Sequence, residues 1–373
     1  MRLLILSAKT GGGHEMRASA LTEIANSIGI ETLTMRPLEE GSKIDYFGSN
    51  LYNWIQRFYP RMHQLYFRFL EFGGLHRRAS LIRKKGFFKE KVARFSPDLV
   101  VSVHAHLNHG FRDIICNNEL SPLRPKFFIY CGELSDGRGY SRHWINPTVD
   151  EFWVPFKDSA KAAISRGMPS LKCNVVGPLL RKPFYKKPLE DDSRNFFSKT
   201  GIPYNSEICL LATGANGRQN HMLAIESLIK SSFRGQIIAL CGGNRRVKEQ
   251  LIKLSGDGNI QLNVLDSLNG KDMAQVIYHS RWIYGRPGAG LTTEALVLNK
   301  AMIFDTSGGV MPQEENNLNY WRDNCQRLSV AKNPSFLGTL LRQSLPPFRD
   351  KKNFSERKIL NRLKTVRDGI TKS

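Results

Sequence analysis

Two glycine-rich segments, far apart in the chain, each stand where a strand pattern ends and a helix pattern begins. Gly11-Gly12-Gly13 follows the apolar run 3–7, and the segment 285–290 (GRPGAG) follows the apolar run 282–284. Glycine lets the backbone approach a ligand closely, and the N-terminus of the next helix favours negative charge. Each segment alone is also compatible with a plain tight turn. Neither matches GxxxxGK[ST] or GxGxxG, which disfavours ATP hydrolysis and dinucleotide oxidoreduction.

Carboxylates and amides cluster behind the second glycine segment. Glu294 is expected in the first turn of the following helix, where it could accept both hydroxyls of a ribose or simply complement the helix dipole. Residues 312–317 (PQEENN) come at the end of the next strand pattern. They could bind sugar hydroxyls by hydrogen bonds, although helix N-capping is the simpler account.

Alternating strand and helix patterns place both segments at the carboxyl ends of parallel strands. Helix patterns separate the apolar runs. Because ligands bind outside the carboxyl ends of such strands, the sequence predicts an α/β protein whose two Rossmann-like parallel-sheet domains face a central cleft. The runs are 3–7, 31–35, 97–103, 126–131 and 152–155 in the first half, and 208–212, 237–241, 260–264, 282–284 and 301–305 in the second.

The division between the domains is expected at a Pro- and charge-rich stretch, 179–192 (LLRKPFYKKPLEDD). We therefore expect an N-terminal domain over residues 1–178 and a C-terminal domain over 179–345. The remaining residues, 346–373, contain a basic amphipathic helix that could pack back on the first domain.

Length, charge and cysteine spacing limit the class of protein. A chain of 373 residues, 41% of them hydrophobic, can bury two cores. Its 55 Lys+Arg against 33 Asp+Glu give a charge of +22, which attracts nucleic acid, phosphate-bearing ligands or an anionic bilayer, or merely solubilises the surface. The six cysteines form no CxxC pair, which indicates a cytosolic protein with reduced thiols. No apolar stretch approaches the roughly 18 residues of a membrane span.

Five motifs, in order over residues 3–325, together resemble the diacylglycerol glycosyltransferases. They are TGGGH (10–14), SVH (102–104), CGGN (241–244), PGAGLTTEAL (287–296) and PQEENN (312–317). That family comprises the monogalactosyldiacylglycerol synthases and the processive diacylglycerol glucosyltransferases. It is related to the enzyme that adds N-acetylglucosamine to the lipid-linked peptidoglycan precursor. The resemblance implies a GT-B fold, a UDP-sugar co-substrate, a lipid acceptor, inversion at the anomeric carbon, and no metal or other cofactor.

The resemblance also assigns site residues. Glu294 would hold the donor ribose, and Gly288 and Gly290 would pass close to the diphosphate. The sugar would be contacted by Gln313, Glu314 and Glu315. Gly214, Asn216 and Gly217 would close over the donor, and Gly242, Gly243 and Asn244 would lie beside the uracil. Arg245 would be available for phosphate, and Arg286 is a further donor-site position. The acceptor side would include Gly12, Gly13, His104, Trp54 and Tyr59.

Proton transfer needs a base, and four residues are candidates: His14, Glu133, Asp136 and His143. We favour His14 and Glu133, because both are expected at strand ends facing the cleft. Many members of the family carry an aspartate in a TDL motif where this chain has 131–134 (CGEL). The extra methylene of Glu133 moves the carboxylate by over an ångström, and the loop up to Trp144 is longer than in the family.

Residues 46–88 mix aromatic and basic side chains, including Trp54, Tyr59, Arg77, Arg78, Lys84 and Lys85. Such a stretch is usually core and solvated surface, but it also suits a helix lying in a bilayer interface. RNA binding by stacking is the competing interpretation, yet no RNA-binding module is visible, so no nucleic-acid partner is expected.

The sequence therefore favours a cytoplasmic, peripherally membrane-associated inverting transferase. It would move a hexose from a UDP-sugar to a diacylglycerol-like lipid at an anionic membrane surface. Two alternatives are a UDP-N-acetylglucosamine 2-epimerase-like isomerase and a non-catalytic protein that binds a nucleotide sugar or a membrane. The sugar, the acceptor and the oligomeric state are left open.

Overall fold

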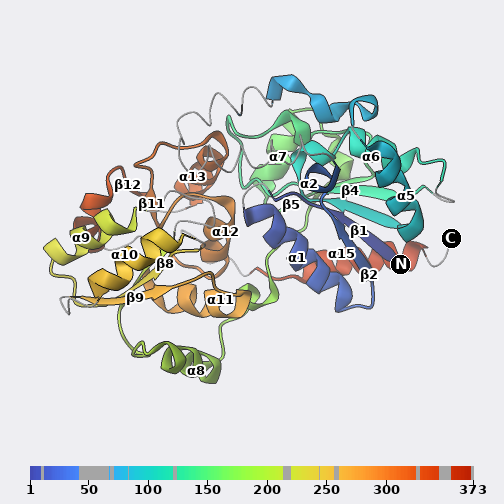
Figure 1. Ribbon diagram of the computed structural model, residues 1–373. Helices are drawn as coiled ribbons and strands as arrows, with labels where there is room; N and C mark the ends of the chain where they lie inside the picture. Colours follow the sequence, from blue (N-terminus) through green and yellow to red (C-terminus); the bar gives the residue numbers. More distant parts are fainter. Residues whose placement is uncertain are drawn as a thin grey trace.

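Two parallel sheets, each flanked by helices, make up the fold (Figure 1). The computed structural model describes residues 1–9, 12–41, 67, 71–82, 84–120, 124–212, 220–242, 244–255, 260–324, 328–343 and 354–370. Within these ranges, no helix combines the length and the apolar character that a membrane span requires.

The first sheet has six strands in the order β2-β1-β3-β4-β5-β6, and every neighbouring pair is parallel. β1, β3 and β4 are central and almost entirely buried, which explains their continuous apolar runs. The strands are β1 (Arg2–Leu6), β2 (Glu31–Met35), β3 (Leu99–Ser102), β4 (Lys126–Tyr130), β5 (Glu151–Val154) and β6 (Cys173–Val175).

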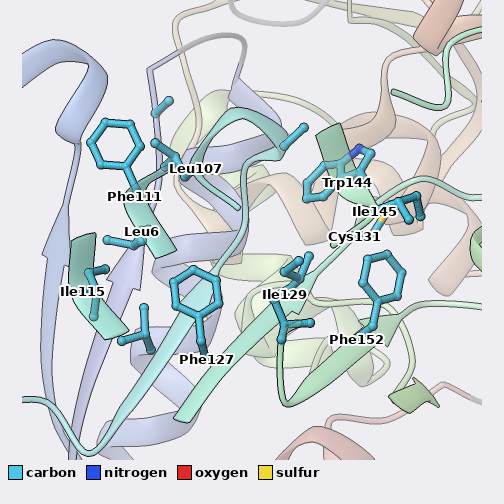
Figure 2. Packing of buried hydrophobic residues seen from close by; sticks show 14 of the residues in the cluster. Leu6, Leu107, Phe111, Ile115, Phe127, Ile129, Cys131, Trp144, Ile145 and Phe152 are labelled. Atoms are coloured by element: carbon cyan, nitrogen blue, oxygen red, sulfur yellow. The ribbon is translucent and has the colours of Figure 1, made fainter. Parts of the chain in front are cut away.

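Both faces of this sheet are covered. One core packs the sheet against α2, α5, α6 and α7, and Figure 2 shows Phe127 and Ile129 of β4 in that core with Phe111 and Ile115 of α6. The other core lies between the sheet, α1 and α15. The helices are α1 (Gly12–Asn26), α2 (Pro37–Gly41), α5 (Lys85–Phe95), α6 (Gly110–Cys116) and α7 (Lys157–Ser165), with short 3₁₀ turns η1 (Leu75–Arg77), η2 (Ala79–Leu81), η3 (Ala105–Leu107), η4 (Arg142–Trp144) and η5 (Ser170–Lys172).

The second sheet repeats this plan in the order β12-β11-β10-β7-β8-β9, again all parallel. Helices α8, α11, α12 and α13 pack on one face, and α9, α10 and α14 on the other. The strands are β7 (Ile208–Ala212), β8 (Gln236–Leu240), β9 (Gln261–Leu265), β10 (Ser280–Gly285), β11 (Ile303–Asp305) and β12 (Ser329–Ala331). The helices are α8 (Glu190–Thr200), α9 (His221–Lys230), α10 (Arg245–Ser255), α11 (Gly270–His279), α12 (Ala289–Val297), α13 (Pro312–Asn324) and α14 (Leu337–Leu341), with η6 (Lys182–Tyr185) and η7 (Pro334–Phe336).

After the second sheet the chain returns to the first. The last helix, α15 (Arg357–Ile370), lies along the first sheet beside α1 and buries Ile359, Leu363 and Val366 there. Arg367 Nη1 donates a hydrogen bond of 3.0 Å to the carbonyl oxygen of Ile28. The chain therefore crosses between the two sheets twice.

The predicted α/β class and two-sheet architecture are confirmed, and three local expectations were wrong. β6 extends the first sheet beyond β5, which the sequence indicated as its last strand. β6 has three residues and none is fully buried, so it lacked an apolar pattern. Part of the expected linker, from residue 190, is helix α8. Glu294 lies in the second turn of α12, because that helix begins at Ala289.

Candidate active site

The N-termini of α1 and α12 meet across the two domains. α1 begins at Gly12, and α12 has Gly288 as its N-cap. Met16 Cε of α1 lies 3.9 Å from the position that a Cβ on Gly290 would take. Gly12 is exposed, Gly13 is half-buried, and no described atom lies within 4 Å of a Cβ position on Gly288. The two helices that follow the predicted glycine segments thus contact each other, one from each domain.

His14 occupies the first turn of α1 and is half-buried. Its Nδ1 lies 2.7 Å from the carbonyl oxygen of Val103, just beyond β3. A carbonyl can only accept, so Nδ1 carries the proton and Nε2 keeps a lone pair. Burial, and then the charge of Arg17, lower the pKa of His14 to about 3. His14 is therefore a neutral imidazole held in the tautomer of a proton acceptor.

His104 lies directly behind His14. It is 5% exposed, and its ring packs edge-on against the His14 ring at 4.5 Å between centroids. Burial holds its pKa well below the ordinary value. His106 and His143 continue this series of ring contacts away from the cleft, at 5.6 Å and 4.5 Å. His104 thus supports His14 from the core, and its predicted contact with an acceptor stays a prediction.

Glu133, the second favoured base, lies just after β4 and links the two domains. Trp144 Nε1 donates to one carboxylate oxygen at 3.3 Å, and Asn316 Nδ2 of α13 donates to the other at 3.2 Å. Burial raises the pKa of Glu133, opposed by the charge of Arg17 and by these two hydrogen bonds. A carboxylate with a raised pKa is a better base than an ordinary one.

The other two candidate bases, Asp136 and His143, have side-chain partners of their own. Asp136 forms an ion pair with Arg166, which lowers its pKa. His143 is 1% exposed and packs against the rings of His106 and His109. A role of either residue as the base stays a prediction.

The sequence interpretation missed Arg17. It is 7% exposed, and its Nη2 donates to the carbonyl oxygen of Gly132 at 2.9 Å. The spacing in the sequence could have revealed it: Arg17 lies three residues after His14, so both side chains project from the same face of α1. A charged residue amid the apolar stripe of a helix at a glycine segment indicates a buried cation at the site.

Glu294, the predicted ribose ligand, lies on α12 of the second domain and is 6% exposed. Arg181 Nη2, from the stretch between the two sheets, donates to its Oε1 at 3.2 Å. Burial raises the pKa of Glu294 to about 7 despite this pairing. Because the N-terminal dipole effect is confined to the first turn, the position of Glu294 in the second turn weakens the alternative of a dipole partner.

Arg286 and Glu314 bind each other. Arg286 Nε donates to Glu314 Oε1 at 2.9 Å, its Nη2 donates to the carbonyl oxygen of Gly309 at 2.9 Å, and both side chains are buried. The pair joins the loop after β10 to the first turn of α13. This geometry favours a supporting role, and direct contact of either residue with a donor stays a prediction.

The PQEENN residues form the first turns of α13, and two of them, Glu315 and Asn316, contact residues of the first domain. Gln313 Oε1 is buried without a hydrogen-bond partner in the described part of the chain, as is Asn316 Oδ1. Buried acceptors are normally satisfied, so Gln313 is suited to receive a sugar hydroxyl. Glu315 is half-buried and accepts from Arg138 Nε at 2.9 Å.

The β8–α10 connection carries the predicted uracil and phosphate residues. Gly242 has a φ of 53°, which glycine tolerates best. Asn244 Oδ1 accepts from the backbone N–H of Val247 at 3.3 Å and so caps α10. Arg245 is exposed. Six predicted residues, Gly214, Asn216, Gly217, Gly243, Trp54 and Tyr59, lie outside the described residues.

Among the described residues, no group of three or more His, Cys, Asp or Glu side chains is arranged to hold a metal ion. His14, Arg17 and the N-termini of α1 and α12 lie where the two domains meet.

This arrangement defines the GT-B fold, in which two parallel-sheet domains enclose a ligand site. Three solved structures share it, each at 12% identity. They are UGT89C1 of Arabidopsis thaliana complexed with UDP-L-rhamnose (TM-score 0.57, 99% of this chain and 95% of that one), MurG of Acinetobacter baumannii (0.51, 98% and 94%) and UDP-GlcNAc 2-epimerase of Neisseria meningitidis bound to UDP-GlcNAc (0.53, 100% and 100%).

Sequence comparison confirms the resemblance that the motifs indicated. The chain is 22% identical to a processive diacylglycerol beta-glucosyltransferase of Bacillus subtilis, covering 100% of this chain and 95% of the relative. It is also 22% identical to monogalactosyldiacylglycerol synthase 1, chloroplastic, of Arabidopsis thaliana, over 88% of this chain and 62% of the relative. No protein-family model matches the chain.

Proposed function

We propose that this chain is a glycosyltransferase that moves a hexose, with inversion, from a UDP-sugar to a diacylglycerol-like lipid. The observation that carries the proposal is the tautomer of His14. Its Nδ1 donates a hydrogen bond to the carbonyl oxygen of Val103, which leaves Nε2 unprotonated. His14 lies in the first domain, whereas the N-terminus of α12 lies in the second. A base and an anion-binding helix end across one cleft are the parts that glycosyl transfer needs.

The reaction follows from these parts. The acceptor hydroxyl gives its proton to His14 Nε2 as its oxygen attacks the anomeric carbon. The bond from that carbon to the UDP oxygen breaks, and UDP takes the electron pair. The backbone N–H groups at the start of α12 stabilise the growing charge. Attack opposite the leaving group inverts the anomeric carbon.

The names of two relatives support the lipid acceptor: one is a processive diacylglycerol beta-glucosyltransferase, and the other is a monogalactosyldiacylglycerol synthase. The surface of the first domain is consistent with a peripheral position at an anionic membrane. Between residues 71 and 87, Phe72 and Phe87 are 77% and 49% exposed. Basic residues on the same stretch are exposed as well. Such a surface can bind a bilayer interface.

The deciding experiment measures UDP release from UDP-glucose, UDP-galactose and UDP-N-acetylglucosamine, with and without vesicles that contain diacylglycerol. Release should depend on the vesicles, and mass spectrometry should find a glycosylated lipid. An epimerase would isomerise UDP-N-acetylglucosamine and ignore the lipid. A protein that only binds nucleotide sugars would give neither product.

Replacing His14 separates chemistry from binding. His14→Ala should lower turnover about 10²–10⁴-fold, because the general base is lost, while the Kd for the UDP-sugar, measured by calorimetry, stays within twofold. His279→Ala is the matched control, since this half-buried histidine lies in the second domain and contacts Ser193 at 3.0 Å. Full turnover in the His14 variant would exclude it as the base.

Replacing Glu294 should affect donor binding, whereas replacing His14 should affect turnover. Glu294→Ala should weaken UDP-sugar binding by roughly 10–100-fold, the effect of losing hydrogen bonds to a charged group. The control is Glu190→Ala, an exposed carboxylate on α8 paired with Arg194. Unaltered affinity in Glu294→Ala would remove Glu294 from the donor site.

A further inference from the structure

Arg17 lies within the cleft wall that carries both proposed proton-transfer groups. It follows His14 by one turn of α1, and it reaches the backbone of the residue before Glu133. Its guanidinium is buried, yet no carboxylate of the described residues lies within the 4.0 Å of an ion pair. Burying a charge is costly without such a partner, so the position of Arg17 calls for a reason beyond packing.

Gly132 is the residue that makes room for Arg17. A Cβ on Gly132 would stand 2.0 Å from Arg17 Cζ and 2.3 Å from Arg17 Nε. No real pair of atoms approaches so closely, and the obstructed group is the head of the arginine. Any side chain at position 132 would therefore push the guanidinium away from the Gly132 carbonyl oxygen.

The charge of Arg17 acts on both neighbours in a defined direction. It disfavours a proton on His14 and favours the ionised form of Glu133. Both effects keep a group that must accept a proton in the unprotonated state, while they reduce its basicity. The hydrogen bond to Gly132 also fixes the backbone turn that carries Glu133.

We propose that Arg17, seated by Gly132, is a positioning residue that holds His14 and Glu133 ready to accept a proton. This inference rests on the function proposed above, because it assigns the electrostatic support of the same base. Arg17 is not assigned a contact with substrate.

Other groups around the pair must be considered in any pH experiment. Titratable and charged neighbours of His14 and Glu133 come from α1, from the segment after β3 and from the loop after β4. The ones that interact electrostatically with them are Arg17, His104, His106, Cys131 and Tyr140, and Asn316 and Trp144 donate hydrogen bonds to Glu133.

The first test does not depend on activity. The protein is labelled with ¹³C and ¹⁵N histidine, the His14 signals are assigned with His14→Asn, and the imidazole is titrated by NMR. In Arg17→Met the protonation of His14 should begin about one pH unit higher than in the unmodified protein. Gly132→Ala should shift it in the same direction, and Arg17→Lys should shift it less, because the charge remains.

The second test uses the transfer reaction. The acid limb of the kcat profile should move to higher pH in Arg17→Met and in Gly132→Ala. Arg112→Met is the matched control, a largely buried arginine of the same domain that pairs with Asp113 and should leave the limb in place. If Arg17→Met does not fold, the His14 titration and the acid limb of kcat in Gly132→Ala and Arg17→Lys test the role of Arg17.

The outcomes separate the two proposals. A His14 titration that is unchanged in all three variants overturns the role of Arg17, even where UDP release proceeds. A shifted titration in a protein that transfers no sugar retains the role of Arg17 and rejects the proposed function. A fall in kcat without movement of the acid limb reduces Arg17 to a structural residue.

Discussion

Two opposing effects act on the pKa of Glu294 where it contacts Arg181: burial raises it and the charge of Arg181 lowers it. The carboxylate is buried, and burial raises its pKa to about 7 from an ordinary value of 4.5, although a guanidinium donates to it at 3.2 Å. The desolvation of Glu294 thus outweighs its attraction to Arg181. Arg181 Nε is itself buried without a partner among the described residues. Such a poorly compensated pair is expected at a binding site rather than in a structural core.

The charge of Glu294 should make folding stability depend on pH. The folded state holds the Glu294 proton more tightly than the unfolded chain, so this group stabilises the protein at acid pH. That stability is lost as the pH rises through the window from 4.5 to about 7. The slope is at most about 1.4 kcal/mol per pH unit for one group. Glu294→Gln should flatten this slope in denaturant unfolding at pH 5, 6, 7 and 8.

Glu190→Gln serves as the comparison for the pH slope. Arg194 lowers the pKa of Glu190, which lies on the surface of α8. Its replacement should leave the slope between pH 5 and 7 intact. Equal slopes in Glu294→Gln and the unmodified protein would contradict the protonation of Glu294 near neutral pH.

At the scale of elements, the loop from Cys131 to Ser141, here called the cleft loop, fastens the first domain to α13 of the second. Arg138 donates to Glu315, and Asn319 Nδ2 donates to the carbonyl oxygen of Asp136 at 3.4 Å. A Cβ on Gly139 would lie 2.1 Å from the carbonyl carbon of Pro312. The loop that departs from the family pattern is therefore the loop that contacts α13, the helix whose first turn carries the proposed sugar ligands.

Gly139→Val should hold the cleft loop away from α13. Because the obstructing atoms belong to the backbone of Pro312 and Gln313, they cannot move aside as a side chain would. We expect a larger radius of gyration in small-angle X-ray scattering and a higher KM for the donor. Gly167→Val is the control, since a side chain there meets no atom within 4 Å, although its φ of 97° adds local strain. An unchanged radius would show that the loop does not hold the domains together.

Sequence patterns predicted the elements well where burial is complete. The central strands read as apolar runs because both faces are covered. The starts of α1 and α12 were predicted because a glycine segment follows a strand in each case. β6 was not predicted, because a three-residue, half-buried edge strand has no apolar pattern. Two contacts of the site join residues far apart in the chain. Arg286 and Glu314 are 28 residues apart, and Arg17 and Gly132 are 115 residues apart. Local pattern carries no information on such contacts.

At the scale of the whole molecule, the excess of 22 positive charges is available for an anionic surface. Reversing Arg77, Arg78, Lys84 and Lys85 to Glu should reduce sedimentation with phosphatidylglycerol vesicles, because each basic residue near such a surface contributes about 1 kcal/mol. All four are exposed.

The control for vesicle binding carries the same change in net charge elsewhere. Lys199, Lys230, Lys253 and Lys332, exposed on the second domain, are reversed together. Equal loss of binding in both variants would indicate attraction by total charge rather than docking through the first domain.

The return of α15 to the first sheet has a consequence for how the chain is made. Arg367 and Ile28, which it brings together, are 339 residues apart. During synthesis the first domain emerges early, but the apolar face beside α1 stays exposed until α15 has been translated. Contacts of such long range slow folding and leave intermediates prone to association. The first domain to be translated is therefore the last to be completed.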